Sequence, residues 1–403
     1  MNRRLLRFGT ITSSVEYFWT QGFQFDRTVA PSFSRNWDHL SFDPGRGLCF
    51  LFGECGMREM KLAAEPVETH SSENRTPILT IAVPTYNRSA NLALLLKNLG
   101  PQLTNEPRVE LIISDNSSPD NTPAVIESFV ASGLRCRYIR NRENVGPDGN
   151  FLQCYAMASG KYLWIFSDDD VILPGTVDTI LRLIEDQDFD LVYMRPLGFI
   201  RDPTERGQVN PRPKTKVLSD ASAFVHAVGL NGDFALISSV IVNKQRIEAV
   251  QHRPFEDGRN TNLIQLSWIF TALNNFRRGL FVQRGLYAVC EENPSRPFDV
   301  AKIFGVNWYN VSSLFLGIGS EVHNAVLNDQ LYSWFPTYWY GLSKSARLTQ
   351  TAPPHSLMRP IYGKRPLYWL CVYPLLKLPR LLAGGWLAVL RGIRKVDRAW
   401  HAP

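Results

Sequence analysis

The sequence has few cysteines, and they follow no pattern. Six are scattered over 403 residues without a CxxC pair, so neither a zinc ribbon nor a disulfide framework is predicted. The histidines form neither an HExxH motif nor a cluster with cysteine, which argues against a zinc site. No apolar run of signal-peptide length follows the basic start MNRRLLRFGT. We therefore expect a protein of the reducing cytoplasm.

Two common nucleotide-binding loops are also missing. The segment LGIGSEV lacks the third glycine of a dinucleotide fingerprint, and the chain contains no GxxxxGK[ST] sequence. NAD-dependent and P-loop ATP chemistry are therefore not indicated. The missing glycine-rich, lysine-bearing loop also disfavours a nucleotidyltransferase that forms sugar nucleotides. What remains is a composition with 44% hydrophobic and 20% charged residues, which is typical of a folded globular protein.

The chain divides into four segments by composition and periodicity. Residues 1–76 show no sustained period and end in the linker-like EPVETHSSENRT, so we expect a poorly ordered N-terminal extension. An over-called start, with translation from Met57 or Met60, is the alternative. The segments that follow are an α/β domain at 77–290, a helical aromatic-rich region at 291–358 and a basic amphipathic tail at 359–403.

Short apolar strands alternate with amphipathic helices from Pro77 onward. This alternation predicts βαβ units in a mostly parallel central sheet flanked by helices. The segment from Pro196 to Pro213 is rich in proline, glycine and charge and predicts a mobile loop. Strands are predicted at 78–83, 109–114, 136–140, 161–166, 190–195, 234–243 and 279–289, with helices at 91–99, 122–132, 148–159, 176–185 and 262–276.

Three consecutive aspartates directly follow the strand KYLWIF. Ligands bind at the carboxyl edge of open α/β sheets, and carboxylates suit a hard divalent cation such as Mn²⁺ or Mg²⁺. In an extended segment, Asp168 and Asp170 would share one face while Asp169 points elsewhere. The alternative is a solvated acidic turn that caps the helix after Pro174.

Four motifs in this order resemble glycosyltransferase family 2, which has the GT-A fold. They are VPTYNR at 83–88, SDNSSPD at 114–120, ENVGPDGN at 143–150 and FSDDDVILPG at 166–175. The resemblance covers roughly Pro77 to Val289. Within the family, YLWIFSDDDVILPG is similar to abequosyltransferase-like enzymes of bacterial surface polysaccharide assembly.

The resemblance implies an inverting enzyme that moves a sugar from a nucleoside-diphosphate donor to a lipid-linked or polysaccharide acceptor. It implies that the aspartates act as a DxD motif, whose divalent cation neutralises the charge on the departing diphosphate. Asp168 and Asp170 are the metal ligands if the segment is extended. Alignment with the common family sequence LDADD selects Asp169 and Asp170 instead. A non-catalytic GT-A-fold partner protein at the membrane is the alternative function.

The resemblance also assigns residues to the nucleotide sugar. Asp115 reads the nucleobase, although DNSSPDN is also suited to an Asx-turn. Pro84 shapes the turn after the first strand, and Thr85 and Tyr86 line the nucleotide pocket. The full set of predicted donor contacts is Pro84, Thr85, Tyr86, Asp115, Asn144, Asp148, Asp168 and Asp169, in which Asn144 and Asp148 contact ribose or sugar and helix capping is the alternative for Asp148.

Inverting transfer also requires a general base that removes the proton of the acceptor hydroxyl. The family places an acidic pair before a helix, and Glu256 and Asp257 occur in that order. The resemblance therefore assigns the base to Asp257, with Asp233 as the rival. An acidic loop that only caps the helix at Asn262 is the structural alternative.

The C-terminal tail carries more than the whole net positive charge of the chain, which is +7. From Arg359 onward it contains one acidic residue, Asp397, and nine basic residues: Arg359, Lys364, Arg365, Lys377, Arg380, Arg391, Arg394, Lys395 and Arg398. Its apolar stretches are too short to span a bilayer. We expect two short helices on an anionic membrane surface, hence a peripheral protein on the inner face of the cell membrane. Helices packed on the protein itself are the alternative, and no nucleic-acid partner is predicted.

Overall fold

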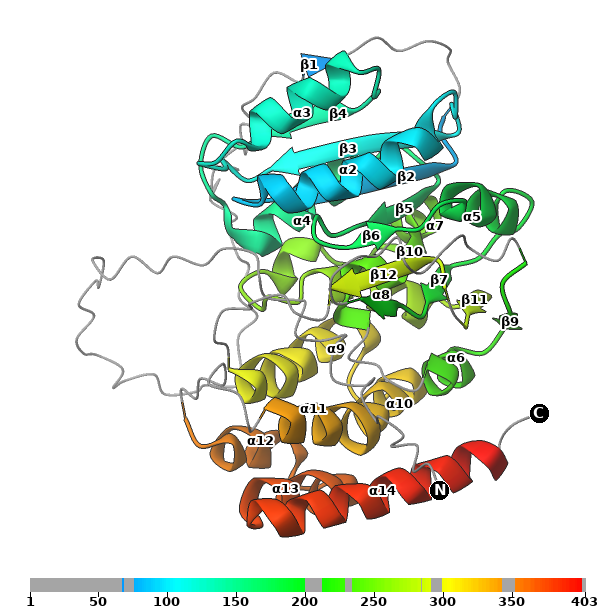
Figure 1. The fold of residues 1–403 in the computed structure, drawn as a ribbon. Helices are drawn as coiled ribbons and strands as arrows, with labels where there is room; N and C mark the ends of the chain where they lie inside the picture. Colours follow the sequence, from blue (N-terminus) through cyan, green and yellow to red (C-terminus); the bar gives the residue numbers. More distant parts are fainter. Residues whose placement is uncertain are drawn as a thin grey trace, which may run out of the picture.

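The computed structural model describes residues 67–68, 76–199, 212–228, 234–283, 285–290, 299–342 and 352–400. A sheet with flanking helices is followed along the chain by a helical region. Figure 1 shows helices α12 to α14 at the end of the molecule opposite to β4 and α3. The predicted α/β class with a helical C-terminal region is confirmed.

The main sheet has nine strands in the order β1-β4-β3-β2-β5-β10-β7-β11-β9. The strands β4, β3, β2 and β5 are parallel, as are β7 and β11. The strands β1, β9 and β10 pair antiparallel, so the sheet is mixed where a mostly parallel one was predicted. A buried apolar run carries no sign of its direction. The bounds are β1 Val67–Glu68, β2 Leu79–Thr85, β3 Val109–Asp115, β4 Arg137–Arg140, β5 Tyr162–Ile165, β7 Leu191–Met194, β9 Thr215–Leu218, β10 Val240–Asn243 and β11 Gly279–Val282.

Helices cover the two faces of this sheet. The chain moves outward from β2 to β3 and β4 and then returns past β3 and β2 to β5. Because such crossovers are right-handed, α2 and α3 lie on one face and α4 on the other. The helices of this region are α2 Ser89–Leu103, α3 Thr122–Ala131, α4 Gly146–Met157, α5 Thr176–Ile184, α6 Ala221–Val228, α7 Lys244–Val250 and α8 Gln265–Asn274.

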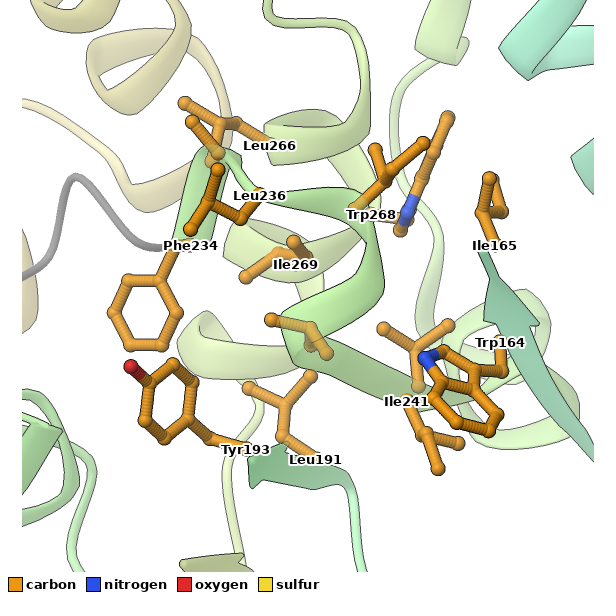
Figure 2. Close-up of a cluster of buried hydrophobic side chains, with 14 of the residues drawn as sticks. Trp164, Ile165, Leu191, Tyr193, Phe234, Leu236, Ile241, Leu266, Trp268 and Ile269 are labelled. Carbon is orange, nitrogen blue, oxygen red and sulfur yellow. The ribbon is translucent and has the colours of Figure 1, made fainter. Parts of the chain in front are cut away.

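The hydrophobic core is continuous from the sheet into the C-terminal helices. One cluster of buried side chains begins at Leu79 and extends to Leu387. Helix α8 is buried along nearly its whole length, because it packs on β10 and β7 on one side and on α9 on the other. Figure 2 shows part of this core, with the labelled side chains Trp164, Ile165, Leu191, Tyr193, Phe234, Leu236, Ile241, Leu266, Trp268 and Ile269.

A second, three-stranded sheet lies beside the first. It consists of β6 (Val171–Ile172), β12 (Tyr287–Cys290) and β8 (Leu197–Phe199) in that order. The predicted strand at 279–289 is broken, because Gly285 has a φ of 97° and the two halves join different sheets. The predicted mobile loop is wrong at residues 197–199, which form β8. Residues 234–239, predicted as strand, contain 3₁₀ turns.

The C-terminal region is helical as predicted. Helix α9 packs on α8, and α10 packs on α6. Within the described ranges, no helix is long and apolar enough to cross a membrane. The elements are the π-helical turns η6 Ala301–Asn307, η7 Gln330–Trp334 and η8 Tyr368–Val372, and the helices α9 Trp308–Leu316, α10 Glu321–Asp329, α11 Phe335–Leu342, α12 Pro354–Tyr362, α13 Tyr373–Lys377 and α14 Arg380–Trp400.

Of residues 1–75, the structure describes Val67 and Glu68. They form β1, which pairs with β4 at the edge of the main sheet. The poorly ordered N-terminal extension stays a prediction. Met57, Met60 and the rest of residues 1–75 lie outside the described residues.

Candidate active site

The three aspartates lie in a turn between β5 and β6. The Asp170 backbone N–H donates to the Ser167 carbonyl oxygen at 3.3 Å, and the Ser167 N–H donates to Ser238 Oγ at 3.0 Å. Strand alternation does not apply inside such a turn. The predicted extended arrangement, with Asp168 and Asp170 on one face, is therefore wrong, and it is Asp168 and Asp169 that converge on one partner.

That partner is Arg88, which stands directly before α2. Its Nη1 atom donates to Asp168 Oδ1 at 2.9 Å and to Asp169 Oδ2 at 2.7 Å. The remaining oxygens accept from hydroxyl groups, Asp168 Oδ2 from Thr85 at 2.8 Å and Asp169 Oδ1 from Ser167 at 2.8 Å. All four carboxylate oxygens of the pair are thus engaged by the protein.

The aspartates are buried. Asp168, Asp169 and Asp170 are 0%, 3% and 1% exposed, and the Arg88 side chain is 11% exposed. Burial raises the pKa of Asp168 above its usual range, although the Arg88 guanidinium acts in the opposite direction. Three adjacent carboxylates in a buried site need a positive charge nearby, and the guanidinium supplies one.

The donor set suits a hard divalent cation in its chemistry, because it offers several carboxylate oxygens within one turn. Arg88 also behaves as a stand-in for such an ion, since it brings positive charge to Asp168 and Asp169. As the side chains lie, no group of three or more His, Cys, Asp or Glu residues in the described part of the chain is arranged to hold a metal. In this arrangement Arg88 occupies carboxylate oxygens of Asp168 and Asp169 that a cation would use.

Asp115 ends β3 and is fully buried. Its Oδ1 accepts from the Ser118 N–H at 2.8 Å, and its Oδ2 accepts from the Tyr138 hydroxyl at 2.9 Å. The Arg140 Nε atom lies 3.5 Å from the same Oδ2. The turn contact that was the structural alternative is present, and the carboxylate also joins β3 to β4.

The loop after β2 lies beside the loop after β3. The Asn87 N–H donates to Ser118 Oγ at 2.9 Å, and Asn87 adopts a φ of 54°. Pro84 and Thr85 belong to the strand itself and are buried, whereas Tyr86 is partly exposed. Thr85 joins β2 to the aspartate turn, so two of the predicted site segments meet here. The predicted role of Pro84 in a turn is replaced by a place in the strand.

Asn144 and Asp148 both hold loops in place. Asn144 Oδ1 accepts from the side-chain amide of Asn116 at 2.8 Å and from the Gly146 N–H at 2.9 Å. Asp148 Oδ2 accepts from the Asn262 N–H at 3.1 Å. Burial raises the pKa of Asp148 to about 6, while the backbone N–H groups of residues 260–264 oppose this.

Of the two candidate general bases, Asp257 lies within the described residues and Asp233 does not. Asp257 is exposed in the 3₁₀ turn η5 (Phe255–Gly258), and its Oδ2 accepts from Arg253 at 2.9 Å. The bond from Asn262 to Asp148 ties the loop after Asp257 to the first turn of α4, at the same sheet edge as the aspartates.

Sequence reasoning gave no role to Arg88. The signal was present, because Arg88 is the single cation of VPTYNR and immediately precedes a helix. Its partners are 80 and 81 residues away in the sequence. No local pattern links residues at that separation, so only the folded chain identifies the contact.

Comparison with known families identifies the central part of the chain. Residues 80–244 match the model described as Glycosyl transferase family 2. This range includes Asp115 and the three aspartates. The predicted family is therefore confirmed for this segment, in agreement with the predicted GT-A type of fold.

Two relatives and one solved structure are similar to the chain. Abequosyltransferase RfbV of Salmonella typhimurium is 30% identical over 183 residues, 43% of this chain and 55% of that protein. A GalNAc(5)-diNAcBac-PP-undecaprenol beta-1,3-glucosyltransferase of Campylobacter jejuni is 32% identical over 107 residues, 26% of this chain and 34% of that protein. The chain thus spans about half the length of the first relative and about a third of the length of the second. The structure of S. aureus TarS 1-349 in complex with UDP-GlcNAc has a TM-score of 0.49 and 16% identity, and the similarity covers 66% of this chain and 76% of that one.

Proposed function

We propose that the family 2 domain at residues 80–244 transfers a sugar from a nucleoside diphosphate to a lipid-linked or polysaccharide acceptor, with inversion at the anomeric carbon. The observation that carries the proposal is the buried aspartate turn at the carboxyl edge of the sheet, inside the segment that matches the family. Buried carboxylates are costly. Their retention at a ligand-binding edge favours catalysis over a scaffold role.

The residues of the chain have separate tasks in this proposal. Asp170, together with Asp168 or Asp169, would hold Mn²⁺ or Mg²⁺, and the ion would supply positive charge to the departing diphosphate. Thr85 fixes the orientation of Asp168 through its hydroxyl bond. Asp115, fixed by Ser118 and Tyr138, presents its remaining lone pairs to the base, while Tyr86 lines the pocket. Asn144 positions the loop beside them.

Asp257 is proposed as the general base. Its pairing with Arg253 is exposed, and an exposed ion pair is weak enough to separate when an acceptor arrives. Asp148 then acts as a positioning residue, because it holds the loop that follows Asp257. Asp233 remains the rival.

The experiment is a donor screen with UDP, GDP, dTDP and CDP sugars in the presence of Mn²⁺ or Mg²⁺. We expect turnover with one donor class in the wild type and none in Asp170→Ala, with unchanged thermal unfolding. Turnover that survives both a chelator and this substitution would remove the cation and Asp170 from the mechanism. Binding of donors without turnover, in the presence of acceptor lipids, would favour the non-catalytic partner instead.

We further propose that the enzyme works in the cytoplasm, attached to an anionic membrane surface through α14 and η8. Of the twelve large hydrophobic side chains that are exposed among the described residues, seven lie between Trp369 and Ile393. Such a concentration of exposed apolar side chains in one segment suggests that a partner covers them. The seven are Trp369, Leu370, Leu378, Leu381, Leu382, Val389 and Ile393.

Helix α14 has an inner and an outer apolar face. Ala383, Leu387 and Leu390 are buried against the protein, so the alternative of packing on the protein holds for one face. Leu382, Val389 and Ile393, spaced seven and four residues apart, form an adjacent face and are 60%, 50% and 51% exposed. The Trp386 indole donates to the Leu370 carbonyl oxygen at 2.9 Å, which keeps η8 beside this face.

The exposed basic residues near this outer face favour an anionic lipid surface as its partner. Lys377, Arg380 and Arg391 are exposed, and an apolar face bordered by basic residues suits anionic headgroups above acyl chains. Arg394, predicted with the other basic residues of the tail, is buried. Its Nη1 donates to the Ser333 carbonyl oxygen at 2.8 Å, so it fastens α14 to the protein instead of facing lipid.

Vesicle flotation of the full-length protein tests this attachment. We expect binding to vesicles that contain phosphatidylglycerol, and affinity lowered about tenfold or more when Leu382, Val389 and Ile393 are all changed to Gln, since each loses apolar burial in the interface. The matched control changes Leu94, Val217 and Ile318, which are exposed elsewhere, and should bind as the wild type does. Equal loss in both triple variants would contradict the proposal.

A further inference from the structure

Arg88 stands between the aspartates and any incoming cation. One nitrogen of its guanidinium contacts both Asp168 and Asp169, at 2.9 and 2.7 Å. The side chain is 11% exposed while the carboxyl groups are fully covered. A ligand that approaches these two carboxylates therefore meets a positive charge already bound to them.

We propose that Arg88 is a positioning residue that closes the aspartate site, because it competes with the divalent cation for Asp168 and Asp169 and leaves them when the cation and the donor bind. The inference rests on the proposed function, since it concerns the cation of the same site. Two positive charges at one carboxylate pair repel each other. Cation binding and release of Arg88 are then a single coupled event.

The phosphate oxygens of the donor can accept hydrogen bonds from the released guanidinium. A planar guanidinium binds phosphate oxygens through two parallel hydrogen bonds, and Arg88 follows the segment Thr85–Tyr86 proposed to line the nucleotide pocket. The donor diphosphate therefore favours the open state, and it arrives together with the cation. An enzyme with this device keeps its buried carboxylates neutralised when no donor is present.

The protein suggests a matched pair of variants. Arg88→Gln removes the charge but keeps a long side chain with an amide that can donate to a carboxylate. Arg88→Lys keeps the charge and loses the planar fork. Asp170→Asn serves as the control for the cation site, and Arg88→Ala is a second charge-free variant should Arg88→Gln fail to fold. Thermal unfolding identifies variants that are folded.

The experiment is a titration of the full-length protein with Mn²⁺ at pH 8 without donor, in which electron paramagnetic resonance measures the free ion. We expect the Kd for Mn²⁺ to fall about tenfold or more in Arg88→Gln, because an adjacent charge alters the proton affinity of a carboxylate by at least that factor. Arg88→Lys should remain near the wild type. Asp170→Asn should abolish binding in each background.

Two outcomes overturn the inference and are distinguishable. If wild type and Arg88→Gln bind Mn²⁺ equally while Asp170→Asn abolishes binding, the cation site stands and the competition is excluded. If no variant binds Mn²⁺ in an Asp170-dependent manner, the cation site itself falls and the competition falls with it. Sugar transfer in the donor screen then shows whether the enzymatic function survives.

Discussion

At the carboxyl edge of the main sheet Arg88 and three aspartates are nearly or fully buried, whereas four large apolar side chains of α14 are exposed. Each arrangement reverses the usual distribution of polar and apolar side chains. Both occur in a chain whose core is otherwise continuous and apolar. Departures from consistent folding are expected at functional sites.

The two regions tolerate their departures for different reasons. At the sheet edge, hydrogen bonds and ion pairs from Thr85, Ser167 and Arg88 compensate the buried carboxylates. On α14 the exposed apolar side chains have no such compensation within the described residues, which is why we propose a lipid surface there. In the two proposals a ligand disrupts contacts at the first region, whereas a lipid surface adds contacts at the second.

The strongest test of the sheet edge is Asp168→Asn. This change removes one negative charge and leaves an acceptor for Thr85, so the fold should persist while the rate of transfer falls by about a hundredfold to a thousandfold, the scale of one lost electrostatic contact at a reacting centre. Steady-state kinetics with the donor found by screening provides the measurement. Asp178→Asn, an exposed aspartate paired with Arg182, is the control. Equal rates of sugar transfer in Asp168→Asn and Asp178→Asn would show that the buried aspartate contributes no more to the reaction than an exposed one.

A pair of leucine substitutions tests the difference between the inner and outer faces of α14. Leu387 is 1% exposed and Leu382 is 60% exposed. Leu387→Ala should lower the free energy of unfolding by about 2–5 kcal/mol because it leaves a cavity, whereas Leu382→Ala should change it by less than about 0.5 kcal/mol. Urea unfolding monitored by circular dichroism measures both. Similar destabilisation by the two would mean that the outer face is packed in solution.

A smaller effect concerns Asp148, another buried carboxyl group at the sheet edge. Its pKa is raised from the usual 3.8 to about 6, so the folded protein holds this proton more tightly than the unfolded chain. Below pH 3.8 the carboxyl group is protonated in both states and does not destabilise the fold. As the pH rises through 6 the group ionises in the folded protein, and the free energy of unfolding decreases. Asp148→Asn should therefore gain about 2–3 kcal/mol relative to the wild type between pH 4 and pH 7. A constant difference in unfolding free energy across this range would exclude the shifted pKa.

The parallel half of the sheet could be predicted because each βαβ unit has local signals. Buried apolar runs end at turn residues, and helices such as α2 bury Leu92, Leu95, Leu96 and Leu99 at helical spacing. The antiparallel pairing of β1, β9 and β10 and the existence of a second sheet could not be predicted in this way, although the predicted strand at 234–243 contains β10. Their partners are distant in sequence, and an apolar run of four residues does not indicate whether the strand is parallel or antiparallel to its neighbours.

The sequence by itself determined that residues 80–244 form a family 2 domain, that acidic side chains stand at the carboxyl edge of its sheet, and that the tail is basic and apolar. Those properties follow from short motifs and composition. Only the tertiary structure decided that Asp168 and Asp169 meet Arg88, that Arg394 is buried, and that four large apolar side chains of α14 are exposed. Such contacts depend on which elements pack together, because charge and burial at a residue are set by neighbours that local sequence does not specify.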